Sequence, residues 1–353
     1  MTDLAPIASY PGPHDPVGEG LGLLRQRFTA LGPARRGATL SHRKVAIVGC
    51  GAVGMACALS MLHRSCLEEL VLVDVATERL EGEVMDLCHG MPFLPRADVR
   101  AGRIEREGEG ADLVVITAGV AQQPGQSRLE LIEANAELFR RIIPAIAAHC
   151  PRAVLLVVSN PVDPLTHIAA ELSGFPHHRV LGSGTVLDSA RFRMAISRRL
   201  GLDPHDVQAW VIGEHGDSEV PVWSRVAVGG LGLFDDSGLP PVVDDPELRE
   251  LFNREVRQAA GEIIRRKGST SWAIGLATAE IVEAVLRSRE QVLTVSTRVG
   301  AEDGLPDVCL SLPTVVNHTG ALARLRLALS GQERSDLEHS ARLLRQTLDA
   351  AGF

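Results

Sequence analysis

The second half of the chain contains a histidine between glycines, with a carboxylate and a guanidinium upstream. His215 stands in Gly213-Glu214-His215-Gly216-Asp217, directly after an apolar run, where the backbone would position it and leave it open to a ligand. Asp188 and Arg191 lie three residues apart in a predicted helix, so both can face the same side. Oxidation of a 2-hydroxy acid needs a base for the hydroxyl proton, a cation for the carboxylate and a hydride acceptor. His215 and Arg191 would supply the first two, and Asp188 would hold the imidazole tautomer. An ordinary ion pair on a helix face is the alternative.

A glycine-rich segment in the first half has the spacing of a dinucleotide-binding turn. Gly49-Cys50-Gly51-Ala52-Val53-Gly54 fits G-x-G-x-x-G, an apolar run precedes it, and Asp74 stands 20 residues after its last glycine. The first glycine permits the tight turn, the second lets the backbone approach a pyrophosphate, and the third lets helix and strand pack closely. The helix N-terminus offers amide donors to the phosphates. Asp74 would accept hydrogen bonds from ribose hydroxyls and repel the extra phosphate of NADP, so NAD is the expected cofactor. A helix N-cap is another role that suits this aspartate.

The elements that must position these residues follow from the apolar runs. Four runs predict buried strands and are separated by helical stretches, which indicates a Rossmann-type, doubly wound parallel sheet. A more mixed α+β pattern follows it. The predicted strands are 45–48, 70–73, 113–116 and 154–158, and the predicted helices include 54–64, 128–149, a long helix from Ser189, 246–266 and 335–351, with strand-like stretches near Trp210 and Val220. We expect an α/β chain with a NAD-binding domain over residues 43–182 and a catalytic domain over residues 183–353.

Residues 1–42 have a different character from the rest. Prolines and glycines interrupt any periodicity there, and the segment predicts a mostly disordered extension with a short helix around Leu21–Leu31. Several arginines give its second half a basic character, but acidic residues open it, which argues against a targeting sequence. We expect an arm that packs on a neighbouring subunit.

The composition excludes several classes of protein. The net charge of −8 argues against a nucleic-acid partner, and no apolar run reaches the roughly 18 residues of a membrane helix. The six cysteines form no C-x-x-C pair and do not cluster with histidines at the spacing of metal ligands. A cytoplasmic protein with reduced thiols and no metal site is expected.

The chain resembles the L-lactate/malate dehydrogenase family over about residues 44 to 350, and it is most similar to the L-lactate dehydrogenases. The resemblance rests on many motifs in the same order. They are Gly49–Gly54, Met85-Asp86-Leu87-Cys88-His89-Gly90, Ser159-Asn160-Pro161-Val162-Asp163, Gly184-Thr185-Val186-Leu187-Asp188-Ser189-Ala190-Arg191, Gly213–Asp217 and Lys267-Gly268-Ser269-Thr270-Ser271-Trp272.

The resemblance implies roles for particular residues. His215 would be the acid–base, Asp188 its partner and Arg191 a bidentate clamp for the substrate carboxylate, while Asn160 and Thr270 would line the substrate pocket. The residues implied near the cofactor are Gly49, Gly51, Val53, Gly54, Asp74, Arg79, Gly119, Ser159, Asn160 and Ser183. A non-catalytic NAD-binding protein is the alternative from another class, but its signature would be loss of His215, Arg128 or Arg191, and all three are present.

The segment 120–128 resembles the mobile active-site loop of the family. Arg128 would polarise the substrate carbonyl when the loop closes and expels water. Gln122 stands where related lactate dehydrogenases carry glutamine and malate dehydrogenases carry arginine. A second carboxylate would stay unpaired in a closed pocket beside a neutral amide, so pyruvate and lactate are the expected substrates, as in glycolysis and pyruvate fermentation. Gln123 and Gln126 depart from the usual pattern, and malate or larger 2-hydroxy acids are the alternative substrates.

The resemblance also suggests a homo-oligomer, either a tetramer or a dimer, and an allosteric site. Arg193 matches an arginine that binds fructose 1,6-bisphosphate between subunits of related bacterial enzymes. The histidine that would complete that site is replaced by Gln208, which can donate a hydrogen bond but carries no charge. An intersubunit salt bridge made by Arg193 is the alternative.

Overall fold

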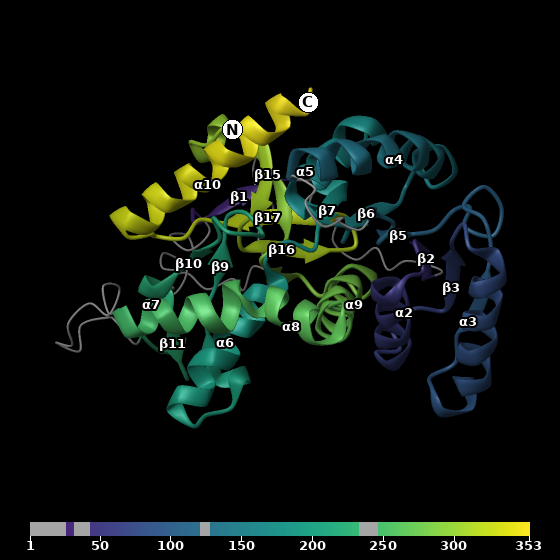
Figure 1. Ribbon diagram of the computed structural model, residues 1–353, viewed down its shortest axis with the longest axis horizontal. Coiled ribbons are helices and arrows are strands. Elements are labelled where there is room, and N and C mark those ends of the chain that lie inside the picture. The colour runs from purple at the N-terminus through teal and green to yellow at the C-terminus, as the bar shows by residue number, and fades with distance from the viewer. Residues whose placement is uncertain (1–25, 32–42, 121–127, 233–245) are drawn as a thin grey trace, which may run out of the picture.

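The computed structural model describes residues 26–31, 43–120, 128–232 and 246–353 (Figure 1). Six parallel strands make up most of its large sheet, in the order β4-β3-β2-β5-β6-β7, with β4 at one edge. The chain enters at β2, runs outward through β3 and β4, and returns to add β5, β6 and β7 on the other side. The Rossmann-type α/β fold predicted from the apolar runs is confirmed. The bounds are β2 Lys44–Val48, β3 Glu69–Val73, β4 Asp98–Ala101, β5 Leu113–Ile116, β6 Val154–Val157 and β7 Val180–Gly182.

Helices cover both faces of this sheet, because alternate strand residues point to opposite sides. In β2, Val45 and Ile47 pack in the core that α2 and α9 share, whereas Ala46 and Val48 pack in the core that α4 and α5 share. The strand order reverses beside β2, so the carboxyl ends of β2 and β5 border the crevice where such sheets bind ligands. The bounds are α2 Ala52–His63, α3 Thr77–Gly90, α4 Arg128–His149, α5 Val162–Ser173 and α9 Trp272–Leu286.

The second half of the chain extends the same sheet. β14 pairs with β7 and β15 pairs with β14, both antiparallel, so the sheet has eight strands in the part of the chain described. This extension was not predicted, because short apolar runs do not reveal which edge they join. A separate core around Phe192, Trp223 and Phe252 lies under α6. The bounds are α6 Val186–Leu200, β8 Val207–Gln208, β9 Val211–Ile212, β10 Val220–Pro221, β11 Ala227–Val228, β12 Leu231–Gly232, α7 Pro246–Phe252, a π-helical segment Asn253–Arg257, α8 Ala259–Lys267, β14 Ser296–Val299, β15 Val308–Ser311 and α10 Gly331–Ala350.

The described part of the N-terminal extension corrects one expectation. Phe28–Ala30 form β1 rather than the end of a short helix, and β1 pairs antiparallel with β17 of the same chain. β17 pairs with one side of the strand's backbone, and the Arg326 amide also donates to the Arg27 carbonyl oxygen at 2.6 Å. Tertiary pairing has therefore overridden the local helical pattern. The remaining strands of this smaller sheet are β13 Gln291–Leu293, β16 Thr314–Asn317 and β17 Gly320–Leu325. Among the described residues, no helix is both long and apolar enough to span a membrane.

Candidate active site

The glycine-rich turn lies between the carboxyl end of β2 and the start of α2. Gly49 has φ +98°, in the left-handed region, and a Cβ there would overlap the backbone of Ala118. A Cβ on Gly54 would overlap the carbonyl oxygen of Gly49, so this glycine allows the helix to approach the turn. Gly51 caps α2, and no other atom lies within 4 Å of where its Cβ would be. The turn therefore presents open backbone at a helix N-terminus, which suits a phosphate group.

Asp74 follows β3 and is tied to the same turn. Its Oδ2 accepts a hydrogen bond from the Cys50 amide at 2.6 Å, and its Oδ1 accepts one from the Ala76 amide at 2.9 Å. Ala76, not Asp74, is the N-cap of α3, so the simple N-cap interpretation does not apply. Arg79 donates to the Cys50 carbonyl oxygen at 2.7 Å and lies 3.7 Å from the Asp74 carboxylate. A carboxylate and a guanidinium thus border the far end of the turn. Val53 lies partly buried in the first turn of α2.

The carboxyl ends of β5, β6 and β7 carry the other residues predicted near the cofactor. Ser159 is buried and donates to the Ala118 carbonyl oxygen at 2.6 Å. Gly119 leaves room beside Asn135, whose side-chain oxygen accepts from the Val120 amide at 2.8 Å. Asn160 is exposed and precedes a cis peptide bond to Pro161, and Ser183 is buried after β7. The described residues along this edge thus fit an extended dinucleotide, with phosphate donors at one end and small or amide side chains at the other.

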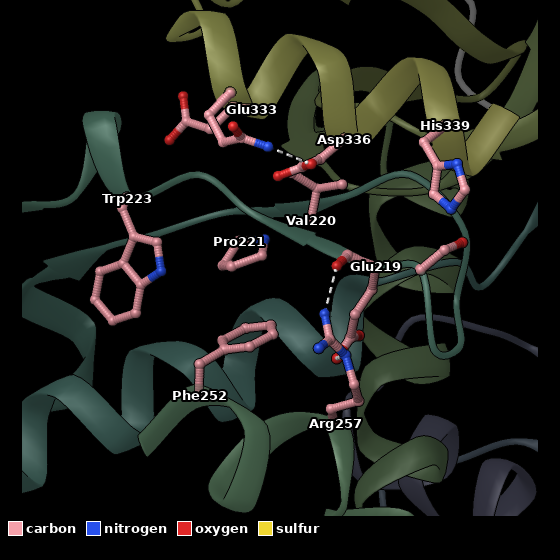
Figure 2. Close-up of a pocket in the computed structure, with 11 residues that line it drawn as sticks. Glu219, Val220, Pro221, Trp223, Phe252, Arg257, Glu333, Asp336 and His339 are labelled. Carbon is pink, nitrogen blue, oxygen red and sulfur yellow. Dashed lines mark hydrogen bonds and ion pairs between the residues drawn. The ribbon is translucent and has the colours of Figure 1, made fainter. Parts of the chain in front are cut away.

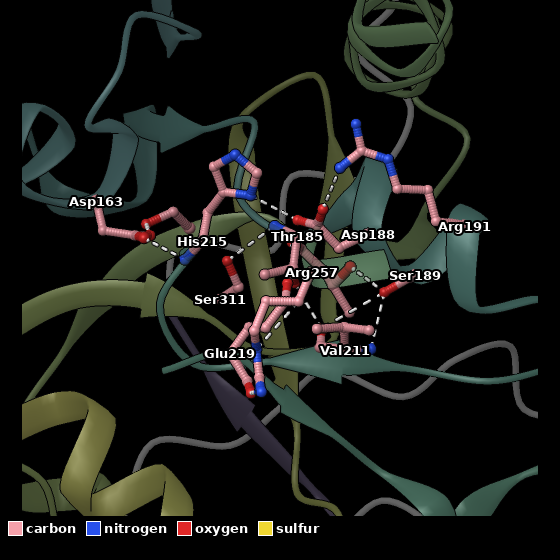
Figure 3. Close-up of polar contacts among 12 residues, drawn as sticks. Asp163, Thr185, Asp188, Ser189, Arg191, Val211, His215, Glu219, Arg257 and Ser311 are labelled. Carbon is pink, nitrogen blue, oxygen red and sulfur yellow. Dashed lines mark hydrogen bonds and ion pairs between the residues drawn. The ribbon is translucent and has the colours of Figure 1, made fainter. Parts of the chain in front are cut away.

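His215, Asp188 and Arg191 form one connected group (Figure 3). The Nδ1 atom of His215 lies 2.6 Å from Oδ2 of Asp188, and Nη1 of Arg191 donates to Oδ1 of the same carboxylate at 2.8 Å. Asp188 is 2% exposed, whereas the His215 side chain is 26% exposed and can still be reached. Both oxygens of one buried carboxylate are therefore used to orient an imidazole and a guanidinium.

The backbone around His215 is held by contacts from distant segments. Gly213 and Ser311 exchange backbone hydrogen bonds, each of 2.9 Å, in an isolated β-bridge to β15. Asp163, buried in the first turn of α5, accepts from the His215 amide at 2.7 Å and from the Ser296 hydroxyl at 2.6 Å. Asp163 is the last residue of the motif Ser159–Asp163, but the sequence alone predicted no role for it. The available signal was a single acid in an otherwise apolar first helical turn.

The electrostatics of the group favour a protonated histidine. The negative charge of Asp188 outweighs burial and raises the pKa of His215 to about 9. Burial disfavours ionisation of Asp188, but His215 and Arg191 together hold its pKa below the ordinary value. An imidazolium and a carboxylate therefore coexist at neutral pH. Such a pair can give a proton to an oxygen and take it back.

The other predicted residues are placed as follows. Thr270 lies partly buried in the turn between α8 and α9, and Arg193 lies partly buried on α6, two residues beyond Arg191 and so on another side of the helix. Gln122 lies outside the described residues. Arg128 is the first residue of α4, and its side chain is also outside the described part. No three His, Cys, Asp or Glu side chains are grouped as metal ligands within the described ranges.

Comparisons with known proteins agree with this geometry. The model of the NAD-binding domain of lactate/malate dehydrogenases matches residues 43–182, and the model of their alpha/beta C-terminal domain matches residues 185–352. The chain belongs to the lactate/malate dehydrogenase family. It therefore contains the family's NAD-binding domain, and the turn at Gly49–Gly54 lies inside that domain.

Relatives within the lactate/malate dehydrogenase family are similar over most of their length. The chain is 50% identical over 307 residues to the L-lactate dehydrogenase of Synechococcus sp. (strain JA-3-3Ab), covering 87% of this chain and 99% of that protein. It is 51% identical over 311 residues to the L-lactate dehydrogenase of Gloeobacter violaceus, covering 88% and 94%. A solved lactate dehydrogenase from a Medee basin deep-sea metagenome library superimposes with TM-score 0.84 at 38% identity, covering 89% of this chain and all of that one. The minor L-lactate dehydrogenase from Enterococcus mundtii gives TM-score 0.82 at 39% identity, covering 88% and 98%.

Proposed function

We propose that this protein is an NAD-dependent L-lactate dehydrogenase that catalyses (S)-lactate + NAD⁺ = pyruvate + NADH + H⁺. The observation that carries the proposal is the shared carboxylate of Asp188, which orients His215 for proton transfer and Arg191 for an anionic substrate group. The two relatives at 50% and 51% identity are L-lactate dehydrogenases, which supports the choice of substrate within the family.

His215 would be the acid–base. Its Nδ1 atom is engaged with Asp188, so Nε2 is the atom that exchanges a proton with the substrate oxygen. In pyruvate reduction Nε2 gives its proton to the carbonyl oxygen; in lactate oxidation the neutral Nε2 takes the hydroxyl proton. A pKa of about 9, set by Asp188 against burial, keeps His215 protonated at neutral pH, ready for pyruvate. The bound nicotinamide supplies or accepts the hydride.

Arg191 would bind the substrate carboxylate. One of its N–H groups already donates to Asp188, which fixes the guanidinium plane and leaves other N–H groups for a bidentate contact. Arg128, brought in by the loop that contains Gln122, would polarise the carbonyl, and Asn160 and Thr270 would complete the pocket. These assignments come from the residue types and the family motifs.

We assign the cofactor residues along the edge of the sheet. The N-terminus of α2 at Gly51 would bind the pyrophosphate, and the Asp74 carboxylate would accept the ribose hydroxyls. Val53, Arg79, Gly119, Ser159 and Ser183 would surround the rest of the dinucleotide. We place the domain boundary between residues 182 and 183, leaving residues 1–42 as an extension, and we propose a cytoplasmic location, which the six free cysteines support.

Steady-state kinetics with a panel of 2-oxo acids tests the proposed substrate. Pyruvate should have a kcat/KM at least about tenfold above oxaloacetate, since a neutral pocket leaves the second carboxylate of oxaloacetate unpaired. It should also exceed that of 2-oxoisocaproate, because a pocket fitted to a methyl group excludes a branched side chain. Gln122→Arg should reverse the preference toward oxaloacetate. Higher kcat/KM for oxaloacetate in the unmodified enzyme would instead identify a malate dehydrogenase, and turnover of none of these acids would favour a non-catalytic NAD-binding protein.

We also propose a homo-oligomer with a fructose 1,6-bisphosphate site at Arg193. Burial lowers the pKa of Arg193, so its charged form gains from an anionic partner, while Glu280 on α9 is the charge acting on it within the described chain. The sugar bisphosphate should lower the KM for pyruvate and favour the larger oligomer, and Arg193→Gln should remove both effects. Superimposable saturation curves with and without the bisphosphate would leave Arg193 a structural residue.

A further inference from the structure

A buried glutamate lies close to the proton-transfer group and has no role in the mechanism above. Glu219 is 4% exposed and comes four residues after His215, directly before β10. Its amide donates to the Gly216 carbonyl oxygen at 3.1 Å, which folds the chain back toward the histidine. In Figure 3, Glu219 lies beside the Arg257 guanidinium in the lower part of the view, and the His215–Asp188 contact lies above them. A buried carboxyl group therefore stands four residues after a histidine whose partner is itself a buried carboxylate.

Arg257 contacts Glu219 but forms no side-chain hydrogen bond with its Oε1 atom. Arg257 donates through Nη2 to the backbone oxygen of Glu219 at 2.9 Å, while its Nε atom lies 3.9 Å from the side-chain Oε1, beyond hydrogen-bond distance. The guanidinium also lies over the Phe252 ring, 5.4 Å from its centroid. Among the described residues, Oε1 of Glu219 accepts no hydrogen bond. This arrangement stabilises a carboxylate poorly and a neutral carboxylic acid well.

Glu219 also lines a cavity of about 490 Å³ (Figure 2). Apolar side chains from β10 and α7 form part of the wall, and Glu333, Asp336 and His339 face the cavity from α10. Titratable and charged groups from several elements thus act on Glu219 or line the same cavity. They are Asp188 and Arg191 on α6, His215 in its own loop, Arg257 on the π-helical segment, and the three groups on α10; Asp163 on α5 faces His215.

Burial and these charges together shift the pKa of Glu219 upward, into the mildly alkaline range. Burial first, and then the charge of Asp188, raise the pKa of Glu219 to about 8, while His215, Arg257 and Arg191 act in the opposite direction. The charge of Glu219 in turn raises the pKa of His215. The two groups are therefore linked, because a carboxylate at position 219 makes the imidazolium more stable.

We propose that Glu219 is a positioning residue for proton transfer, whose carboxylate helps to keep the proton on His215 in alkali. The inference rests on the proposed function, because it assumes that His215 is the acid in pyruvate reduction. The buried carboxyl, the offset Arg257 and the position of Glu219 four residues after His215 carry it. Ionisation moves one proton from Glu219 to solvent and breaks no other bond.

The two directions of the reaction should respond oppositely to Glu219→Gln. Pyruvate reduction needs protonated His215, so the alkaline decline of kcat/KM for pyruvate should begin about one pH unit lower in the variant. The ratio of kcat/KM at about pH 9.5 to kcat/KM at about pH 6.5 should therefore fall roughly tenfold. Lactate oxidation needs neutral His215, so its rise with pH should begin about one unit lower. An alkaline limb that does not move, or a loss of the same size at every pH in both directions, would overturn the proposal.

Asp336→Asn is the matched control, since Asp336 is an exposed acid on the same cavity. It removes the same charge without touching the proton-transfer group, and the alkaline limb should stay in place. An equal movement in both variants would mean that overall charge, rather than Glu219, sets the limb.

Infrared spectroscopy on the unmodified protein keeps the proposal testable if Glu219→Gln does not fold. The carbonyl band of a protonated carboxyl should disappear between about pH 7 and pH 9, and Arg257→Gln should move this loss to higher pH because a cation has been removed. Absence of any such titration would overturn the proposal. This measurement needs no turnover, so an enzyme inactive toward pyruvate but with the titrating band would refute the proposed function alone.

Discussion

Replacing Asp188 by asparagine tests the central electrostatic argument. The asparagine would keep the shape of the side chain and an oxygen for Arg191, but it would lose the charge that lies 2.6 Å from Nδ1 of His215. That charge is the largest influence on the histidine and raises its pKa from an ordinary 6.5 to about 9. The difference corresponds to about 3 kcal/mol in favour of the imidazolium at 1.36 kcal/mol per pKa unit.

The loss should depend on pH in a defined way. Burial remains in the variant and disfavours the imidazolium, so the pKa of His215 should fall to 6.5 or below. At about pH 7.5 no more than about a tenth of the enzyme would then carry the proton needed for pyruvate reduction. Poorer control of the tautomer adds to this, and we expect kcat/KM for pyruvate to fall by roughly 10²–10³. Near pH 5.5 the loss of kcat/KM relative to the unmodified enzyme should be at least about tenfold smaller than at pH 7.5.

The assay is NADH consumption with pyruvate across the pH range, with thermal unfolding and NADH binding as checks that the fold and the cofactor site are intact. An alkaline limb that stays near pH 9 would refute the reasoning, because it would show that Asp188 does not set the pKa of His215. A loss of equal size at about pH 5.5 and pH 7.5 would also refute it, since that pattern indicates damage to the pocket rather than a missing proton.

Three further predictions concern the cofactor site and stability. Gly54→Ala should abolish NADH binding or folding, because its Cβ would overlap the Gly49 carbonyl oxygen. Gly51→Ala should fold and lose only NADH affinity, since its Cβ would meet open space. Similar Kd and Tm values for the two variants would contradict this prediction. Asp74 should make kcat/KM with NADH at least about tenfold higher than with NADPH, and equal values would exclude that role. Burial and Asp188 raise the pKa of Glu219 from 4.5 to about 8, so the folded chain holds this proton more tightly than the unfolded chain and stability falls as pH rises through this interval. Glu219→Gln should flatten the decline in urea unfolding between about pH 5.5 and pH 8.5, and parallel curves would argue against it.

Local patterns were enough to predict the parallel sheet and the glycine-rich turn. The run Val45–Val48 is a buried strand because all its side chains are apolar and both faces are covered, and this signal lies in neighbouring residues. The turn follows for the same reason, since the backbone at Gly49 and the close approach at Gly54 depend on what the adjacent residues can adopt. The types and spacing of Asp188 and Arg191 likewise predicted that they share one side of a helix, and they do.

Contacts between distant segments could not be predicted in this way. The segment of β1 was expected to be helical, but it pairs with β17, some 295 residues later in the chain. The residues around β1 do not reveal a partner so far away in the sequence. β14 joins the large sheet because the edge of β7 has unpaired backbone groups, and β15 then pairs with β14. The residue patterns of β14 and β15 do not indicate which edge they would join.

The protonation of His215 was likewise decided by the tertiary structure. The sequence by itself determined that a histidine, an aspartate and an arginine of the right types were present. The β-bridge between Gly213 and Ser311 and the Asp163 carboxylate then bring His215 to within 2.6 Å of Asp188. Burial and the distance between charges set a pKa, and both quantities exist only once the chain has folded. For that reason Glu219, an ordinary acid in the sequence, becomes a buried group coupled to His215 only in the folded protein.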